Sequence, residues 1–97
     1  MAILVLLEAT AKAECVSAMK DFFMEHFPET RAYDGCRGIT AHMNADDSRT
    51  FVLVEHWNTK DDFQKYVAWR IETGGVAQLA SLLEGTPNVR YFETVAA

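Results

Sequence analysis

The residues best suited to chemistry lie in the segment 50–57, where one acid stands among apolar and aromatic side chains. Alternate side chains of an extended strand share a face, which places Glu55 beside Leu53 and Trp57. An apolar setting raises the pKa of a carboxyl group, so Glu55 could act as a base near neutral pH. Equally, Glu55 could form an ion pair with a basic residue across a subunit interface.

Three histidines could exchange protons near neutral pH. His42 lies near the end of a predicted strand and could face a cavity. His56 points away from Glu55 and Trp57, toward the helices if the face of those two residues lines the cavity, and is expected to be a core or edge residue. His26 lies near the end of a predicted helix, where it is expected only to meet the negative end of the helix dipole.

A further group of aromatic and polar side chains, Tyr66, Trp69 and Arg70, follows on the next predicted helix. The Tyr66 hydroxyl can donate a hydrogen bond to the oxygen of a phenol or quinone, or it can pack on a helix face. Arg70 could bind an anionic substituent of a ligand, or it could pair with Glu72 or with an acid on the sheet. Each of the three residues is therefore a candidate for the lining of a pocket.

Hydrophobic periodicity predicts the elements that must position these residues. Apolar and alternating patterns predict strands over residues 2–8, 36–44, 50–57 and 88–95. A first helix is predicted over 11–27, because apolar side chains recur there every three or four residues. Thr10 is its expected N-cap, and Pro28 is expected to end it.

A second helix is predicted to begin after Thr59, since a threonine cap followed by Asp61 and Asp62 suits a helix start. Gly74 and Gly75 interrupt the helical pattern, so a short third helix is predicted after them. The inner face of the second helix is expected to carry Phe63, Tyr66, Val67 and Ile71.

This order of elements predicts an α+β fold of the ferredoxin-like β-α-β-β-α-β type, with the second helix split in two and helices on one face of an antiparallel four-stranded sheet. A sheet face open to water should be polar, yet the first strand is apolar on both sides. Ile3, Val5 and Leu7 point one way, and Leu4 and Leu6 point the other. Because a second subunit is the simplest cover for the bare face, we expect a homodimer.

Length and charge narrow the function further. The 97 residues are predicted to form one domain over 1–97. A net charge of −5 without a cluster of lysine and arginine disfavours nucleic-acid binding. No apolar run suits a transmembrane helix and the first residues do not resemble a signal peptide, so we expect a cytoplasmic protein. Cys15 and Cys36 are expected to stay reduced, and no zinc-site spacing is present.

Short motifs along nearly the whole chain resemble the antibiotic biosynthesis monooxygenase (ABM) family. They comprise an apolar first strand, Asp34-Gly35-Cys36, a polar turn at Asn44 to Ser48, Val54-Glu55-His56-Trp57, Thr59 to Phe63 and Val89-Arg90-Tyr91. The resemblance implies a dimeric α+β barrel and, for some members, cofactor-independent oxygenation of polyphenols and quinols. It also implies that Trp57 is a cavity wall. The chain departs from the family at Tyr66, where many members carry histidine, and its aliphatic first strand argues against haem degradation.

The resemblance therefore implies a cofactor-independent monooxygenase that acts with dioxygen on an aromatic substrate of the quinol or polyphenol type. The predicted catalytic residues are Tyr66, His42 and Glu55, and the predicted substrate-binding residues are Trp57, Leu53, Trp69 and Arg70. No metal, cofactor, nucleic acid or membrane is expected. The alternative is a non-catalytic dimeric domain that binds a small apolar ligand or serves a structural or stress role.

Overall fold

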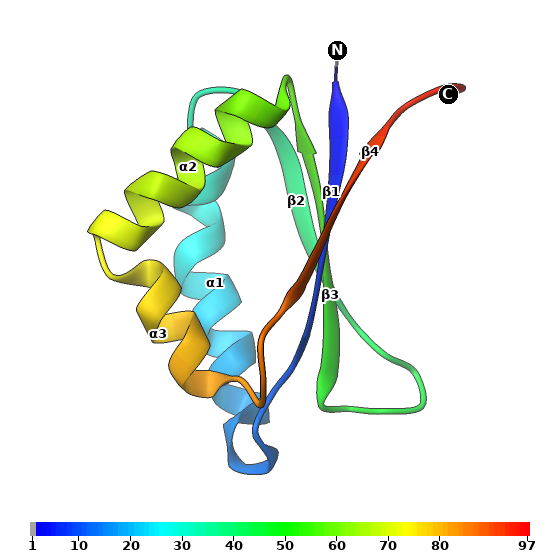
Figure 1. Ribbon diagram of the computed structural model, residues 1–97. Coiled ribbons are helices and arrows are strands. Elements are labelled where there is room, and N and C mark those ends of the chain that lie inside the picture. The colour runs from blue at the N-terminus through cyan, green and yellow to red at the C-terminus, as the bar shows by residue number, and fades with distance from the viewer. Residues whose placement is uncertain (1) are drawn as a thin grey trace.

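The computed structural model describes residues 2–97 and consists of a helical layer on one face of a sheet (Figure 1). The strands are β1 (Ile3–Thr10), β2 (Cys36–Met43), β3 (Thr50–Trp57) and β4 (Asn88–Glu93). The helices are α1 (Val16–Ala32), α2 (Lys60–Glu72) and α3 (Gly75–Leu82), with a 3-10 turn (Ala13–Cys15) before α1. None of the helices within residues 2–97 is long and apolar enough to cross a membrane.

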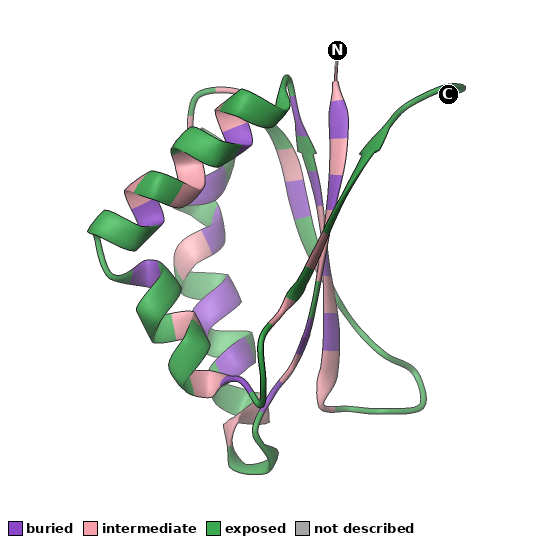
Figure 2. Cartoon of the chain, in the orientation of Figure 1, coloured by how far each residue is buried: buried purple, intermediate pink, exposed green. Residues whose placement is uncertain are grey.

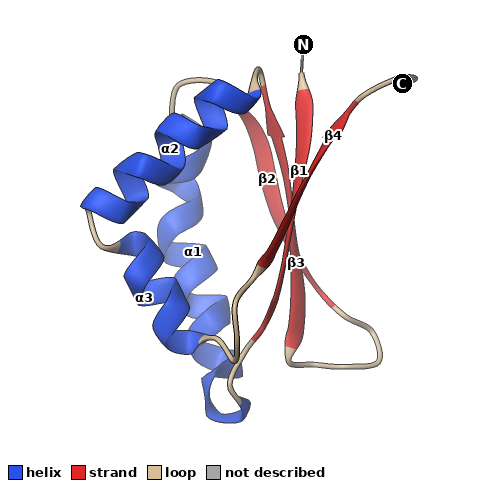
Figure 3. Cartoon of the chain, viewed as in Figure 1, coloured by secondary structure: helices blue, strands red, loops and turns tan. Residues whose placement is uncertain are grey.

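The strand order is β2-β3-β1-β4, and every neighbouring pair is antiparallel. All of the helices lie on the same side of the sheet (Figure 3). This arrangement confirms the ferredoxin-like α+β subunit predicted from the sequence, including the division of the second helical segment into α2 and α3.

The start and end of α1 differ from the prediction. Thr10 does not cap the helix, because it pairs with Thr50 in the β1–β3 ladder and the chain stays extended as far as Ala11. Pro28 does not end the helix but lies inside it. Proline removes only the bond to the carbonyl of Met24, on the exposed side of α1, where water can replace it. The buried neighbours of Pro28 on the inner side keep the helix intact as far as Ala32.

The second helix begins as predicted but buries a different residue near its end. The Thr59 hydroxyl accepts a hydrogen bond from the backbone N–H of Asp62 at 3.0 Å, and Gly74 adopts a left-handed conformation with φ of 87° after α2. Ile71, however, is 62% exposed, whereas Arg70 is only 7% exposed. The predicted inner face was therefore wrong by one residue at its C-terminal end, because Arg70 lies one turn after Tyr66 and faces α1.

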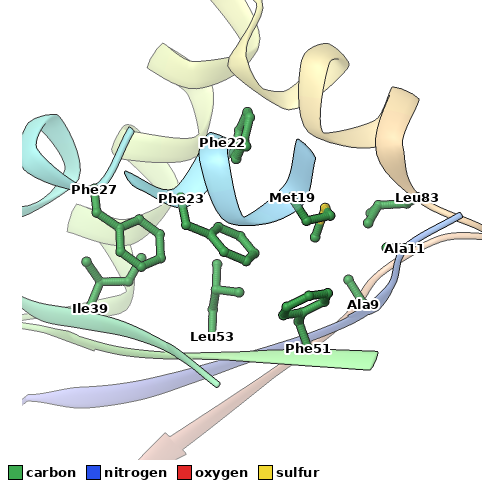
Figure 4. Packing of buried hydrophobic residues seen from close by; sticks show 10 residues of the cluster. All are labelled: Ala9, Ala11, Met19, Phe22, Phe23, Phe27, Ile39, Phe51, Leu53 and Leu83. Atoms are coloured by element: carbon green, nitrogen blue, oxygen red, sulfur yellow. The ribbon is translucent and has the colours of Figure 1, made fainter. Parts of the chain in front are cut away.

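The hydrophobic core lies between α1 and the sheet. The buried residues of α1 include Met19, Phe22, Phe23 and Phe27, and of these Phe23 and Phe27 point toward the strand residues Ile39, Phe51 and Leu53 (Figure 4). A second cluster at the other end of the sheet contains Ile3, Val5, Trp57 and Phe63. Figure 2 shows the resulting pattern, with buried positions on the facing sides of the two layers and exposed positions on the outer side of the helices.

The outer face of the sheet has no cover within residues 2–97 (Figure 1). Cross-strand register places Leu4 beside His56, Leu6 beside Val54, and Glu8 beside Val52 on this side. The same register places Phe92 beside Leu4 and Arg90 beside Leu6. This face therefore has an apolar centre formed by Leu4, Leu6, Val52, Val54 and Phe92, bordered by polar and charged side chains.

The turn between α1 and β2 requires glycine at position 35 for two reasons, its positive φ and the close approach of Asp62. Comparison with Gly74 distinguishes the two effects, because Gly74 shares only the positive φ. Gly35 has φ of 89°, and a Cβ atom there would lie 2.5 Å from Cγ of Asp62. Gly74 has nearly the same φ, but a Cβ atom there would have no neighbour within 4 Å.

We expect Gly74→Ala to lower the free energy of unfolding by about 1–2 kcal/mol through backbone strain. Gly35→Ala should lower it by a further ~1–3 kcal/mol, because Asp62 must shift. Equal losses in urea denaturation at one protein concentration would contradict this account.

Candidate functional site

A pocket of about 580 Å³ lies between the helical layer and the sheet. Every helix and every strand contributes to its lining, and most of the lining side chains are apolar. Several lining residues are exposed to solvent, among them Gln64 on α2, Val76 on α3 and Tyr91 on β4. The pocket therefore opens between α2, α3 and β4. A volume of this size suits a small organic ligand.

A second hollow of about 480 Å³ lies between α1 and the edge strand β2. Its lining carries one ionisable side chain, that of Arg31, beside apolar residues such as Met24 and Phe27. The larger pocket, by contrast, is lined by a carboxyl group, an imidazole, two phenols and a guanidinium group. Of the two pockets, the larger one therefore holds most of the ionisable side chains.

Glu55 is the acid of the larger pocket. It lies on the inner face of β3, between Val5 of β1 and Ile39 of β2 in the sheet register, and is only 3% exposed. Burial raises the pKa of its carboxyl group to about 7, against the opposing effect of a hydrogen bond from the indole of Trp57. The Trp57 Nε1 atom donates this bond to Oε1 of Glu55 over 3.1 Å. No basic side chain within residues 2–97 forms an ion pair with Glu55.

Trp57 lies behind this carboxyl group and is not part of the pocket lining. It is fully buried and contacts the rings of Tyr33, Phe63 and Tyr66, with centroids 6.4, 5.7 and 5.0 Å away. The indole therefore cannot touch a ligand in the pocket as it stands. Its effect on the site is to hold one oxygen of Glu55 in place.

Tyr66 and Arg70 line the pocket and belong to a buried hydrogen-bond network. The Tyr66 hydroxyl lies 2.7 Å from Oγ1 of Thr30 and accepts from Nε of Arg70 at 2.9 Å. Thr30 donates to the carbonyl of His26, which leaves its Oγ1 atom as the acceptor for the Tyr66 proton. Both the proton and a lone pair of the tyrosine are thus engaged.

The Tyr66 phenol and the Arg70 guanidinium are restricted in the proton transfers and hydrogen bonds that they can offer a ligand. Burial raises the pKa of Tyr66, so its phenol is a weaker acid than usual. The Arg70 guanidinium also donates from Nη2 to the carbonyl of His26 at 3.0 Å and to Thr30 at 3.2 Å, and its Nη1 lies 3.5 Å from Glu29. The network therefore joins α2 to α1 rather than presenting free donors to a ligand.

His26 lines the same pocket from α1, on the opposite wall from Glu55. Its Nδ1 atom lies 2.9 Å from the carbonyl oxygen of Phe22, and its ring stacks on that of Phe22 with centroids 3.9 Å apart. The sequence interpretation assigned His26 only to the helix dipole. The signal that it missed is spacing, because His26 lies four residues from both Phe22 and Thr30, which are buried on the same stripe.

The remaining candidate residues, apart from Leu53, lie outside the larger pocket. His42 is exposed on the outer sheet face, where its Nε2 atom lies 2.9 Å from Oγ1 of Thr40. His56 is also exposed on the outer face. The expectation that it points toward the helices was wrong, because the helices cover the face that carries Leu53 and Glu55. Trp69 stacks on Tyr33 outside the pocket lining, and Leu53 lies within the lining.

No group of three or more His, Cys, Asp and Glu side chains within residues 2–97 is arranged to hold a metal ion. The Cys36 thiol is half-buried, and burial raises its pKa. A raised pKa keeps a thiol in its less nucleophilic form.

The fold and the pocket together define a two-layer α+β domain with a mostly apolar pocket between its layers. The sequence profile described as antibiotic biosynthesis monooxygenase (ABM) matches residues 2–69. The chain therefore belongs to the ABM family, as the motifs of the sequence indicated. No curated protein is detectably similar to it in sequence.

Solved structures share the fold over nearly their whole length. Rv0793 from Mycobacterium tuberculosis is 21% identical, with a TM-score of 0.88 over 100% of this chain and 98% of that one. NE2512, a protein of unknown function from Nitrosomonas europaea, is 23% identical, with a TM-score of 0.84 over 99% and 91%. SnoaB from Streptomyces nogalater, a cofactor-independent oxygenase, is 14% identical, with a TM-score of 0.85 over 99% and 95%. Likeness at this level of identity shows the fold alone.

Glu55 is expected to make the protein less stable as the pH rises. Its pKa in the folded protein is about 7, above the ordinary value of 4.5, so the folded state binds this proton more tightly than the unfolded state. Its stabilising contribution is complete below about pH 4.5 and is lost as the pH rises through about 7. Between pH 4 and pH 8 the free energy of unfolding of Glu55→Gln should therefore rise by about 3 kcal/mol relative to that of the native protein.

Urea denaturation at the two pH values measures this difference. The matched control is Glu14→Gln, which makes the same chemical change at an exposed position. Its difference from the native protein should stay constant with pH. A constant difference for Glu55→Gln as well would show that Glu55 ionises normally in the folded protein.

Proposed function

We propose that the chain is a cofactor-independent monooxygenase that acts on an aromatic phenol of the quinol or polyphenol type, with Glu55 as the base. One observation carries the proposal: a single carboxyl group, without an ionic partner in residues 2–97, lines an otherwise mostly apolar pocket and has a pKa of about 7. Membership of the ABM family supports this class of reaction, and SnoaB, a cofactor-independent oxygenase, has the same fold.

The chemistry requires a group that removes a proton from the substrate hydroxyl. A base is most effective when its pKa lies near the working pH, and the pKa of Glu55 meets this condition. The resulting phenolate is rich enough in electrons to pass one electron to dioxygen. The apolar walls keep water from the phenolate and from the superoxide that forms.

The later steps balance without another reductant. When the phenol is the enol tautomer of a ring ketone that carries a CH₂ group, as in an anthrone, superoxide and the substrate radical combine into a carbon–oxygen bond at that former CH₂ carbon, and the peroxide takes back the proton held by Glu55. Cleavage of the oxygen–oxygen bond with loss of the remaining hydrogen on that carbon yields a carbonyl group and water. Overall, CH₂ and O₂ become C=O and H₂O, and the substrate supplies all four electrons.

The other pocket residues have supporting roles in this proposal. Trp57 orients Glu55 through the hydrogen bond to Oε1. Leu53 contacts the substrate, while Tyr66 and Arg70 form a fixed polar wall because their hydrogen bonds are already directed to α1. His42 lies on the opposite face of the sheet and takes no part.

Oxygen consumption with a panel of hydroquinones and anthrones tests the proposal. The native protein should consume dioxygen with at least one substrate, and Glu55→Gln should lower kcat by about 10²–10⁴-fold, the usual contribution of a general base. Glu14→Gln serves as the matched control and should keep the native rate. A native protein without turnover on the whole panel is not an oxygenase of this class, and a fully active Glu55→Gln removes Glu55 from the mechanism.

We also propose that the protein is a homodimer joined through the outer face of the sheet. The apolar centre formed by Leu4, Leu6, Val52, Val54 and Phe92 supports this arrangement, because a second copy could bury it. The family resemblance supports it as well, since the dimeric barrel pairs such faces.

Val54→Glu tests the dimer. Val54 lies between Leu6 and Thr40 in the sheet register, so the new carboxylate would have no cationic neighbour beside it, unlike one at Leu6, which lies next to Arg90. An unpaired charge buried in an interface costs several kcal/mol, so the variant should sediment as a monomer at micromolar concentration. Ala18→Glu, on the exposed side of α1, should leave the dimer intact. A native monomer at this concentration would refute the proposal.

A further inference from the structure

We propose that His26 is a second ligand-binding residue of the pocket, and that its Nε2 atom accepts a hydrogen bond from a ligand hydroxyl other than the one that contacts Glu55. The inference rests on the proposed function and deepens it, because it assigns the residue that recognises the second hydroxyl group of a quinol or polyphenol. It follows from the contacts of the imidazole ring and from the position of His26 across the pocket from the sheet.

The hydrogen bond to the backbone fixes which ring nitrogen is free. A carbonyl oxygen can only accept, so the contact between Nδ1 and the Phe22 carbonyl at 2.9 Å requires that Nδ1 carry the proton. In the neutral ring, Nε2 then holds an unshared lone pair. No group within residues 2–97 forms a hydrogen bond with Nε2, so this lone pair remains available as an acceptor.

The ring is also held in one orientation. It stacks on Phe22 with an interplanar angle of 18°, and the helical turn below it is fixed by the bond from Arg70 to the His26 carbonyl. A side chain held in this way loses little conformational entropy when a ligand binds. The half-buried His26 thus presents a preorganised acceptor in a pocket whose lining is mostly apolar.

The two acceptors lie on different walls. Glu55 projects from β3 in the sheet, and His26 projects from α1 in the helical layer. Of the other polar side chains of the pocket, Tyr66 and Arg70 have their donors and acceptors engaged with α1, whereas Gln64, Thr86 and Tyr91 are exposed to solvent. A flat aromatic ligand with one hydroxyl group can satisfy one wall only, whereas a diol can satisfy both. The geometry therefore favours a diol over a simple phenol.

Binding of stable naphthols under anaerobic conditions tests the inference. The probes are 2-naphthol and the 1,5-, 2,6- and 2,7-dihydroxynaphthalenes, so that no single spacing between hydroxyl groups is assumed. The tightest diol should bind the native protein about fivefold more tightly than 2-naphthol, the effect of one net neutral hydrogen bond. His26→Phe keeps an aromatic ring on Phe22 and should abolish this advantage. His26→Gln, which retains an acceptor at a similar reach, should restore most of it.

The nitrogen signals of the imidazole give a readout that a purely structural role would not move. Two-bond ¹H–¹⁵N correlation spectra should show His26 with a protonated Nδ1 and an unprotonated Nε2. The diol should shift the Nε2 resonance of His26. The signals of His42 and His56, on the outer face of the sheet, should stay in place and serve as the internal control.

The outcomes separate this inference from the proposed function. Tight binding of a diol without a shift of His26 Nε2, or a diol advantage that survives in His26→Phe, overturns the role of His26 and leaves Glu55 and the oxygenase untouched. The role of His26 is likewise overturned if none of the diols binds more tightly than 2-naphthol. No binding of any probe, together with no oxygen consumption on the panel of hydroquinones and anthrones, overturns both.

Discussion

The pocket depends on a buried arginine that joins the two long helices above the sheet. Arg70 of α2 donates to the Tyr66 hydroxyl, to Thr30 and to the carbonyl of His26. A guanidinium group is costly to bury unless acceptors surround it, so this network fixes α2 against α1 in one relative position. Gly75 belongs to the same constraint, because a Cβ atom there would lie 3.0 Å from Cδ of Arg70.

The Arg70 hydrogen-bond network explains why space remains beneath the helices. Five residues of α1 are buried, and apolar packing holds this helix to the sheet. By contrast, α2 buries only Phe63 and Arg70, and α3 buries only Gly75. Because α2 is attached to α1 by hydrogen bonds, apolar side chains need not fill the gap between α2, α3 and β4. The cost of this open space, and of a desolvated Glu55 within it, is typical of sites where function and stability conflict.

Local signals in the sequence predicted most of the fold. The alternating pattern of β3, the Thr59 cap and the Gly74 break all correspond to the observed elements, because each depends on a few neighbouring residues. The errors arose where distant contacts decide the outcome. Pairing with β3 keeps Thr10 extended, and the fit against α1 selects Arg70 rather than Ile71 for burial. Neither contact is visible in the local pattern.

The site was harder to predict because it is divided between two layers. The period of two along β3 correctly groups Leu53, Glu55 and Trp57, but it does not say which face the helices cover. Because the helices cover the face that carries Glu55, this residue lies in the pocket and His56 is exposed to solvent, although the two are adjacent in the sequence. His26 lines the pocket because it shares the buried stripe of α1 with Phe22 and Thr30. A helix stripe can line a cavity as readily as fill it, and only the packing of the opposite layer distinguishes the two.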